Sequence, residues 1–175
     1  MEYRMIGSLK AKKIVLLLLA GLLVILSYAP SHAALRSGDA LPRITLYSLN
    51  GSKVSLPDDY KGKVVVIHFW ASWCPYCIKE IAAIESIYKK YGDKELAPFS
   101  INVGESRDAI NRYIANTTVT YTILLDPDKQ ASKQYWITGV PMTFVADKSG
   151  VLRYKIFGEI TGAGLKKIVS AILGR

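Results

Sequence analysis

Both cysteines of the chain lie in one short stretch, HFWASWCPYCIKE, which spans residues 68–80. Cys74 and Cys77 are separated by two residues, and Glu80 follows Cys77 by three. Two cysteines at this spacing can form a structural disulfide, hold a metal ion or act as a redox couple. A bridge between them closes a very short loop and therefore restricts the unfolded chain little. The pair is poorly suited to a purely structural role, which leaves metal binding and redox chemistry.

Metal binding requires more ligands than the sequence provides. A structural zinc site needs cysteine and histidine ligands in a set of four, and His68 is the only histidine after residue 33. Covalent haem attachment needs a histidine directly after the second cysteine, where this chain has Ile78. Cys74, Cys77 and His68 could together hold copper(I), and this alternative stays open. Otherwise we expect no metal and no cofactor besides the redox-active disulfide itself.

A redox role follows from where the pair falls in a predicted helix. Apolar residues recur at steps of three and four over Cys74–Tyr91, which predicts a helix, and Pro75 suits its first turn. Cysteines three apart at a helix start have Cα atoms about 5–6 Å apart, within reach of a disulfide. The helix N-terminus favours a thiolate at Cys74. We expect Cys74, at the exposed mouth of the helix, to attack, and Cys77, on its inward stripe, to resolve.

The resolving step needs a group that accepts the proton of Cys77. Glu80 borders the apolar stripe of the same helix, so partial burial would raise its pKa toward that of a general base. His68 sits on a β-branched run and is expected to lie buried beneath the pair. It is either a hydrogen-bonded core histidine or a group that tunes the pair or relays its proton.

A second set of residues can contact a substrate. Trp73, Pro75 and Tyr76 surround the cysteines, and a distant proline, Pro141, precedes a predicted strand. A proline there is unusual. A cis Val140–Pro141 bond would leave the backbone of Val140 ready to pair with an extended peptide, whereas an ordinary trans proline would carry no such role.

The elements that must position these residues alternate along the chain. Asn50-Gly51 marks a tight hairpin, and KVVVIHF at residues 63–69 predicts a buried central strand. This order gives an α/β fold with a mixed central sheet and helices on both faces. The strands are predicted at 44–49, 53–56, 63–69, 99–103, 122–125, 142–146 and 151–157, and the helices at 74–91, 106–115, 129–136 and 161–173.

The first 33 residues differ from the remainder. A basic start precedes Ile14–Ala29, which carries no charge, and small residues stand at Ser31 and Ala33. This is the layout of a secretory signal peptide, and an uncleaved membrane anchor is the alternative. Either one exports the rest of the chain, so we divide the sequence into a signal or anchor, 1–33, and one domain, 34–175.

The net charge of the chain is +9, but its basic residues are scattered. Aromatic and basic residues do not alternate along any one predicted element, so we expect no nucleic-acid partner. A solvated surface is the simplest interpretation, with attraction to an anionic membrane face as the alternative. We expect a monomer.

WASWCPYC with its preceding strand, INVGES and GVPMTFV resemble the thioredoxin superfamily. Together with LPRITLYSLNGSKVSL near the start, they are most similar to its membrane-associated TlpA/ResA-like branch, over about residues 38–173. The resemblance implies a thioredoxin-like fold with an N-terminal β-hairpin extension, a cis bond at Pro141 and an acid–base role for Glu80. It also implies thiol–disulfide oxidoreductase activity.

Members of this branch commonly reduce disulfides outside the cytoplasmic membrane, notably in apocytochrome c before haem attachment. They draw electrons from a membrane thiol carrier. This sequence departs from the pattern of the branch at two places that bear on whether the enzyme reduces or oxidises its clients. Pro75-Tyr76 is more usual in glutaredoxins, and His68 replaces the buried aspartate of thioredoxins. Both positions affect the reduction potential, so a disulfide-donating oxidase remains an alternative to a reductant. A second alternative is a protein that binds or delivers copper through Cys74, Cys77 and His68.

Overall fold

The computed structural model describes residues 12–18, 34–115 and 117–175. The chain divides into two units, Met1–Ala33 and Ala34–Arg175. The expected signal or anchor therefore lies largely outside the described residues, apart from a helical segment at 12–18. No helix in the described ranges has the length and apolar character needed to cross a membrane.

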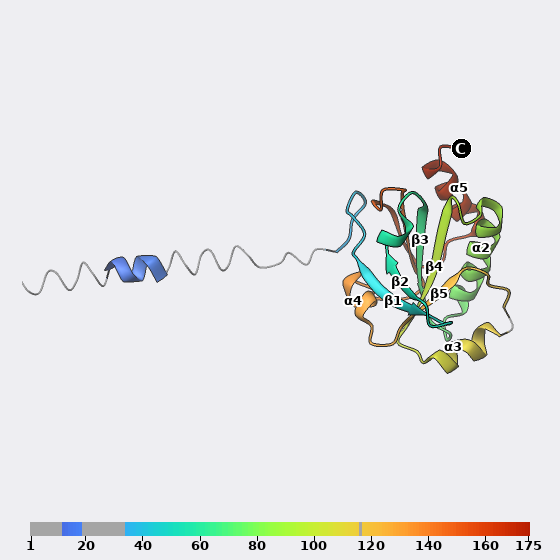
Figure 1. Ribbon diagram of the computed structural model, residues 1–175, viewed down its shortest axis with the longest axis horizontal. Coiled ribbons are helices and arrows are strands. Elements are labelled where there is room, and N and C mark those ends of the chain that lie inside the picture. The colour runs from blue at the N-terminus through green and yellow to red at the C-terminus, as the bar shows by residue number, and fades with distance from the viewer. Residues whose placement is uncertain (1–11, 19–33, 116) are drawn as a thin grey trace, which may run out of the picture. The chain divides into compact units, whose positions relative to one another are not determined.

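The second unit is built on one seven-stranded mixed sheet, with strand order β2-β1-β5-β4-β3-β6-β7 (Figure 1). The strands β3, β4 and β5 are parallel to one another, and the other pairings are antiparallel. The strands are β1 Ile44–Ser48, β2 Lys53–Leu56, β3 Val64–Trp70, β4 Leu96–Val103, β5 Thr122–Asp126, β6 Met142–Ala146 and β7 Leu152–Phe157. The N-terminal hairpin does not stand apart as an extension, because β1 pairs with β5 and so joins the main sheet.

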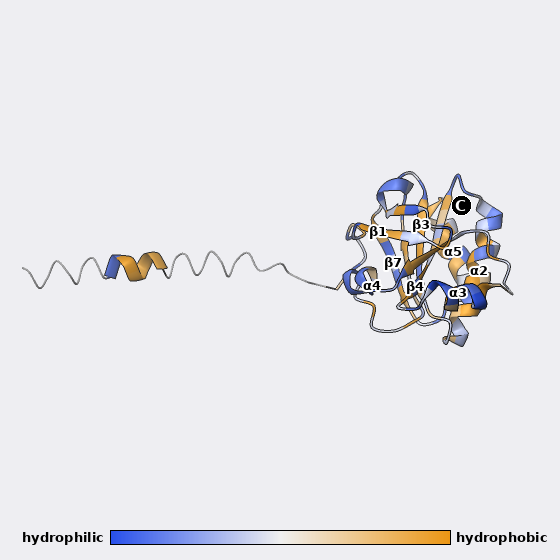
Figure 2. Ribbon diagram, turned by 60° about the horizontal axis from the view of Figure 1, so that its bottom comes forward, coloured by the Kyte–Doolittle hydropathy of each residue, from blue (hydrophilic) through white to orange (hydrophobic). Residues whose placement is uncertain are grey.

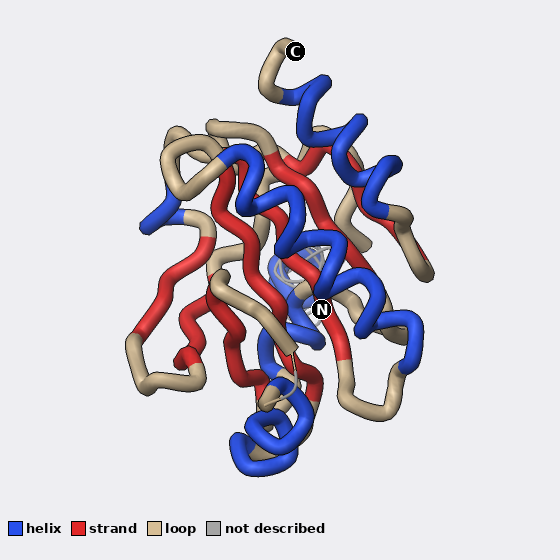
Figure 3. Tube along the Cα trace, turned by 90° about the vertical axis from the view of Figure 1, so that its right-hand side faces the viewer, coloured by secondary structure: helices blue, strands red, loops and turns tan. Residues whose placement is uncertain are grey.

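Helices pack on both faces of the sheet, as the order of elements predicts (Figures 1 and 3). On one face α2 and α5 lie against each other, and α3 adds Ile110 to the same apolar cluster. On the other face Ala131 of α4 and the adjoining Tyr135 contribute to the second cluster. The helices are α2 Pro75–Tyr91, α3 Arg107–Ile114, α4 Gln130–Gln134 and α5 Gly162–Ile172, with a short 3-10 turn η1 at Asp58–Tyr60.

Strand β3 lies inside the sheet between β4 and β6, and Figure 2 shows apolar colour concentrated along it and its neighbours. All of its residues are buried, as expected for a β-branched run flanked by strands on both sides. Side chains alternate between faces. Val66 and Trp70 belong to the cluster on the α2 side, whereas Ile67 and Phe69 belong to the opposite cluster. His68 therefore projects toward α2.

Most predicted elements are confirmed, with differences at their ends. Cys74 caps α2 rather than lying inside it. Strand β4 begins earlier than predicted and contains Pro98. Helix α4 is shorter than predicted, because the chain leaves the helical conformation at Tyr135 and Trp136 follows with a positive φ of 54°.

Candidate active site

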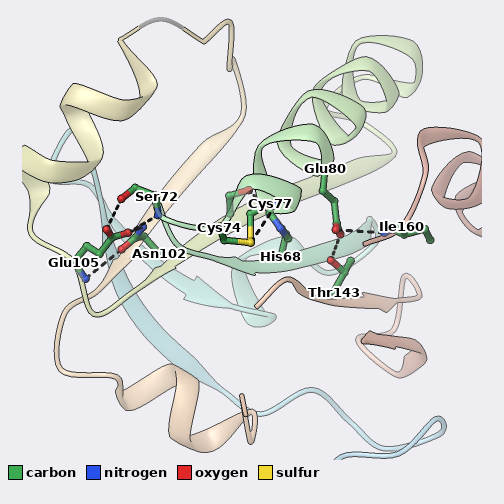
Figure 4. Close-up of a disulfide and its surroundings, with 10 residues drawn as sticks. His68, Ser72, Cys74, Cys77, Glu80, Asn102, Glu105, Thr143 and Ile160 are labelled. Atoms are coloured by element: carbon green, nitrogen blue, oxygen red, sulfur yellow. Dashed lines mark hydrogen bonds between the residues drawn. A yellow bond between two sulfur atoms is a disulfide. The ribbon is translucent and has the colours of Figure 1, made fainter. Parts of the chain in front are cut away.

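Cys74 and Cys77 form a disulfide at the N-terminus of α2 (Figure 4). Their Cα atoms lie 5.4 Å apart, as the helical spacing predicts. The Sγ atom of Cys74 accepts the backbone N–H of Cys77 at 3.3 Å, so Cys74 is the helix cap. Pro75 occupies the first turn, where its missing N–H costs no hydrogen bond. After reduction, this helix N-terminus would stabilise a thiolate at Cys74.

Cys74 was expected at the exposed mouth of the helix. In the oxidised protein, with the Cys74–Cys77 disulfide formed, this expectation is wrong. Cys74 is only 4% exposed and Cys77 is completely buried. The Cys74 sulfur is bonded to the buried Cys77 sulfur and accepts an N–H of the helix, which turns it away from solvent. Trp73 and Tyr76, on either side, are well exposed. Cys74 is still the less buried residue of the pair, and therefore the one a partner can reach first.

Glu80 is fully buried, not merely at the border of the apolar stripe. The Thr143 hydroxyl donates to Oε1, and the Ile160 N–H donates to Oε2 at 3.5 Å. Burial raises the pKa of Glu80 to about 7, with a smaller contribution from Glu159, although the two hydrogen bonds oppose the rise. Glu80 lies one turn from Cys77 on the same helix face. Its carboxyl group can therefore gain or lose a proton near neutral pH, one helical turn from the residue whose sulfur is buried.

His68 is buried beneath the same helix and belongs to a chain of polar side chains. Its Nδ1 lies 3.2 Å from Ser100 Oγ, which lies 2.8 Å from the Tyr121 hydroxyl. Its Nε2 has no hydrogen-bond partner among the described residues. Burial lowers the pKa of His68 to about 3, so the ring is neutral at physiological pH. Figure 4 shows His68 projecting from its strand toward the first turn of α2.

The partners of His68 were not predicted, although a signal for one of them exists. Ser100 is the Cα partner of His68 in the parallel pairing of β3 and β4. A serine within the apolar run that forms β4 could therefore have been matched to the buried imidazole.

A half-buried carboxylate, that of Glu105, was also missed, and it holds the loop that carries Cys74. The Ser72 backbone N–H and hydroxyl donate to Glu105 at 2.7 and 2.5 Å, and the Asn102 amide donates at 2.7 Å. Burial alone would raise the pKa of Glu105, but the hydrogen bonds from Ser72 and Asn102 lower it. This carboxylate joins the loop after β3 to the loop after β4, as Figure 4 shows.

Val140 packs near the redox pair despite its distance in sequence. The Val140–Pro141 bond is cis, as expected, and a second cis bond, Leu56–Pro57, was not foreseen. Val140 packs against the cluster that contains both cysteines, and it lines a groove together with Trp73. In the part of the chain that the structure describes, the Val140 backbone makes no hydrogen bond. Its polar groups are therefore available to an extended peptide.

The described residues contain no group of three or more His, Cys, Asp or Glu side chains arranged to hold a metal ion.

The model of the AhpC/TSA family matches residues 37–155. The chain belongs to the AhpC/TSA family. Within this family it is 29% identical over 161 residues to the thiol-disulfide oxidoreductase ResA of Geobacillus thermodenitrificans, covering 91% of this chain and 92% of that protein. It is 30% identical over 128 residues to ResA of Bacillus subtilis, covering 73% and 71%.

A solved structure of a related protein has the same fold as this member of the AhpC/TSA family. The crystal structure of a putative thiol:disulfide interchange protein DsbE from Chlorobium tepidum matches with a TM-score of 0.75 and 27% identity, over 81% of this chain and 100% of that one. The resemblance to thioredoxin-like proteins of the ResA type is therefore confirmed. The chain is a thiol–disulfide oxidoreductase with a thioredoxin-like fold.

Proposed function

We propose that this enzyme reduces disulfides of client proteins outside the cytoplasm, with apocytochrome c before haem attachment among its clients. The observation that carries the proposal is the buried Glu80, whose pKa of about 7 suits it to take the proton of the buried Cys77. The similarity to ResA proteins supports the type of enzyme. The signal-like residues 1–33 support its location in the periplasm or at the outer face of the membrane.

In the first step, the Cys74 thiolate attacks one sulfur of the client disulfide. A bond forms between Cys74 and that sulfur, the client S–S bond breaks, and the second client sulfur leaves as a thiolate. The Cys77 N–H and the helix N-terminus stabilise Cys74 before attack. Cys74 acts first because it is the less buried residue of the pair.

In the second step, Cys77 gives its proton to the Glu80 carboxylate and attacks the Cys74 sulfur. The mixed disulfide breaks, and the released client thiolate takes up a proton. Two electrons have then passed to the client, and the enzyme holds the Cys74–Cys77 disulfide. A membrane thiol carrier restores the dithiol, so the enzyme needs no other cofactor.

His68 tunes the pair in this proposal through hydrogen bonding rather than charge. The ring is neutral because burial keeps its pKa at about 3. Its unpartnered Nε2 and its Ser100 contact lie on the α2 side of β3. A ring nitrogen that stabilises the thiolate stabilises the reduced pair and makes it more oxidising, and a ring that gives no such hydrogen bond leaves it more reducing.

The client segment binds across the exposed residues around the pair. Trp73, Pro75 and Tyr76 form one side, and the Val140 backbone with Pro141 forms the other. The N–H and C=O of Val140 can pair with an extended client strand, as in other cases of strand addition.

Two measurements test the proposal. The reduction potential of the Cys74–Cys77 couple should lie near that of a reductant, at about −270 mV, and a value near −120 mV would make the enzyme an oxidase instead. Cys74→Ser should abolish insulin reduction, whereas Cys77→Ser should accumulate mixed disulfides with exported clients. Apocytochrome c should be among the trapped proteins, and its absence would remove it from the proposal.

A further inference from the structure

A groove beside the redox pair has a composition that the reaction itself does not require. It has a volume of about 560 Å³ and is lined by Trp73, Val140 and the chain segment that leads into Val140. That segment contributes Lys129, Lys133 and Trp136. The groove thus begins at the residue before Cys74 and ends at the backbone expected to pair with a client.

The backbone of this groove is held in an uncommon conformation. Lys129 and Trp136, with φ of 56° and 54°, are the non-glycine residues of positive φ in the described ranges 12–18, 34–115 and 117–175, and both line the groove. This conformation is unfavourable for bulky L-residues and tends to occur at functional sites. The buried Asp126 carboxylate fixes the helix between them, since it accepts the N–H groups of Ala131 and Ser132 at 3.1 and 2.8 Å.

The charge of the groove is positive. Lys129 and Lys133 are its charged residues, and no carboxylate lines it. Neither ammonium forms an ion pair with any described residue. The Lys129 stem lies over Gly104, where an added Cβ would come within 2.5 Å of Lys129 Cε. The neighbouring Glu105 carboxylate does not line the groove, and its oxygens accept hydrogen bonds from Ser72 and Asn102 rather than from either lysine.

The same groove presents two partly exposed indole rings. Trp73 is 72% exposed and Trp136 is 44% exposed. Exposed tryptophans are typical of surfaces that bind a partner. An occupant that satisfies both features carries a carboxylate beside an apolar side chain.

We propose that this groove binds the client segment next to its disulfide and selects segments in which an acidic residue adjoins an apolar one. Lys129 and Lys133 bind the carboxylate, and Trp73 and Trp136 bind the apolar side chain. The proposal rests on the proposed function, because it assigns the substrate class to the reductase site.

The test uses two synthetic peptides that carry one cysteine as a mixed disulfide with 2-mercaptoethanol. They differ only in the residues after the cysteine, Glu-Leu in one and Lys-Leu in the other. The reduced full-length protein should react with the acidic peptide about fivefold faster at low salt, and high salt should narrow this ratio. The double variant K129Q/K133Q should remove the preference, and Lys133→Glu should reverse it.

The matched control is K166Q/K167Q, which removes two exposed lysines of α5 outside the groove. It should keep the wild-type ratio. Trp136→Gly should lower the reaction rate of the Glu-Leu peptide more than the rate of a Glu-Ser peptide, in which serine replaces the leucine.

Equal rates for the two peptides in a protein that reduces 2-hydroxyethyl disulfide would overturn the groove proposal alone. No reaction with 2-hydroxyethyl disulfide would overturn the proposed function with it.

Discussion

At the scale of single residues, Glu80 shows how burial prepares a group for proton transfer. Its carboxylate is enclosed by α2, β6 and the residues before α5, so its charged form is disfavoured and its pKa rises to about 7. The local sequence indicates a glutamate near the apolar stripe. It does not indicate Thr143 and Ile160, which come from distant elements, and the full burial of Glu80 could not be predicted for that reason.

Glu80→Gln should slow the attack of Cys77 on the mixed disulfide by about a hundredfold, at the lower end of what general acid–base catalysis contributes. In the wild type this rate should rise with pH as Glu80 ionises around its pKa of about 7. In the variant that rise should be absent. Single-turnover kinetics starting from a Cys74 mixed disulfide measure the step.

Glu85→Gln is the control for this prediction, since Glu85 is another buried carboxylate of α2 but accepts hydrogen bonds from Thr120. It should leave the resolving rate and its pH profile unchanged. An unaltered profile in Glu80→Gln would return Glu80 to a structural role.

At the scale of elements, the Glu105 carboxylate fixes the loop between β3 and α2. It joins Ser72 to Asn102, so it sets the direction in which the chain enters the helix that Cys74 caps. A glutamine has one acceptor oxygen instead of two, and its amide group would face the Ser72 donors. This contact depends on two loops that meet only in the folded protein.

Glu105→Gln should lower the free energy of unfolding by about 1 kcal/mol at neutral pH, because the partly buried donors of Ser72 lose an acceptor. The hydrogen bonds lower the pKa of Glu105, so its contribution is present above the ordinary pKa of 4.5 and is lost as the pH falls through the lowered value. Urea unfolding at neutral and acidic pH should therefore show the difference shrinking toward acid. The exposed Asp93→Asn should change little at either pH.

The elements themselves were largely predictable because periodicity and turn residues are local. The predicted strand begins at residue 99, after Pro98, because proline is rare in central strands. The structure tolerates it because β5 pairs with β4 only from Phe99 onward. The left-handed conformation of Trp136 has no local signal, because tryptophan disfavours it and only the surrounding fold imposes it.

At the scale of the whole molecule, residues 34–175 form a unit with its own sheet and apolar clusters. A protein consisting of residues 34–175 should therefore unfold at the same urea concentration as the full chain. It should also reduce 2-hydroxyethyl disulfide at the same rate. A lower midpoint would show that the first unit contributes to the stability of the second.

The two edge strands of the sheet, β2 and β7, carry cationic side chains. Strand β2 begins with Lys53, and β7 carries Arg153 and Lys155 along its length. The start of β7 is further covered by residues 38–41, since Gly38 N–H donates to Leu152 at 2.8 Å. Two copies that approached edge to edge would bring like charges together and find part of the ladder already occupied. The domain should therefore resist strand-mediated aggregation even at high protein concentration.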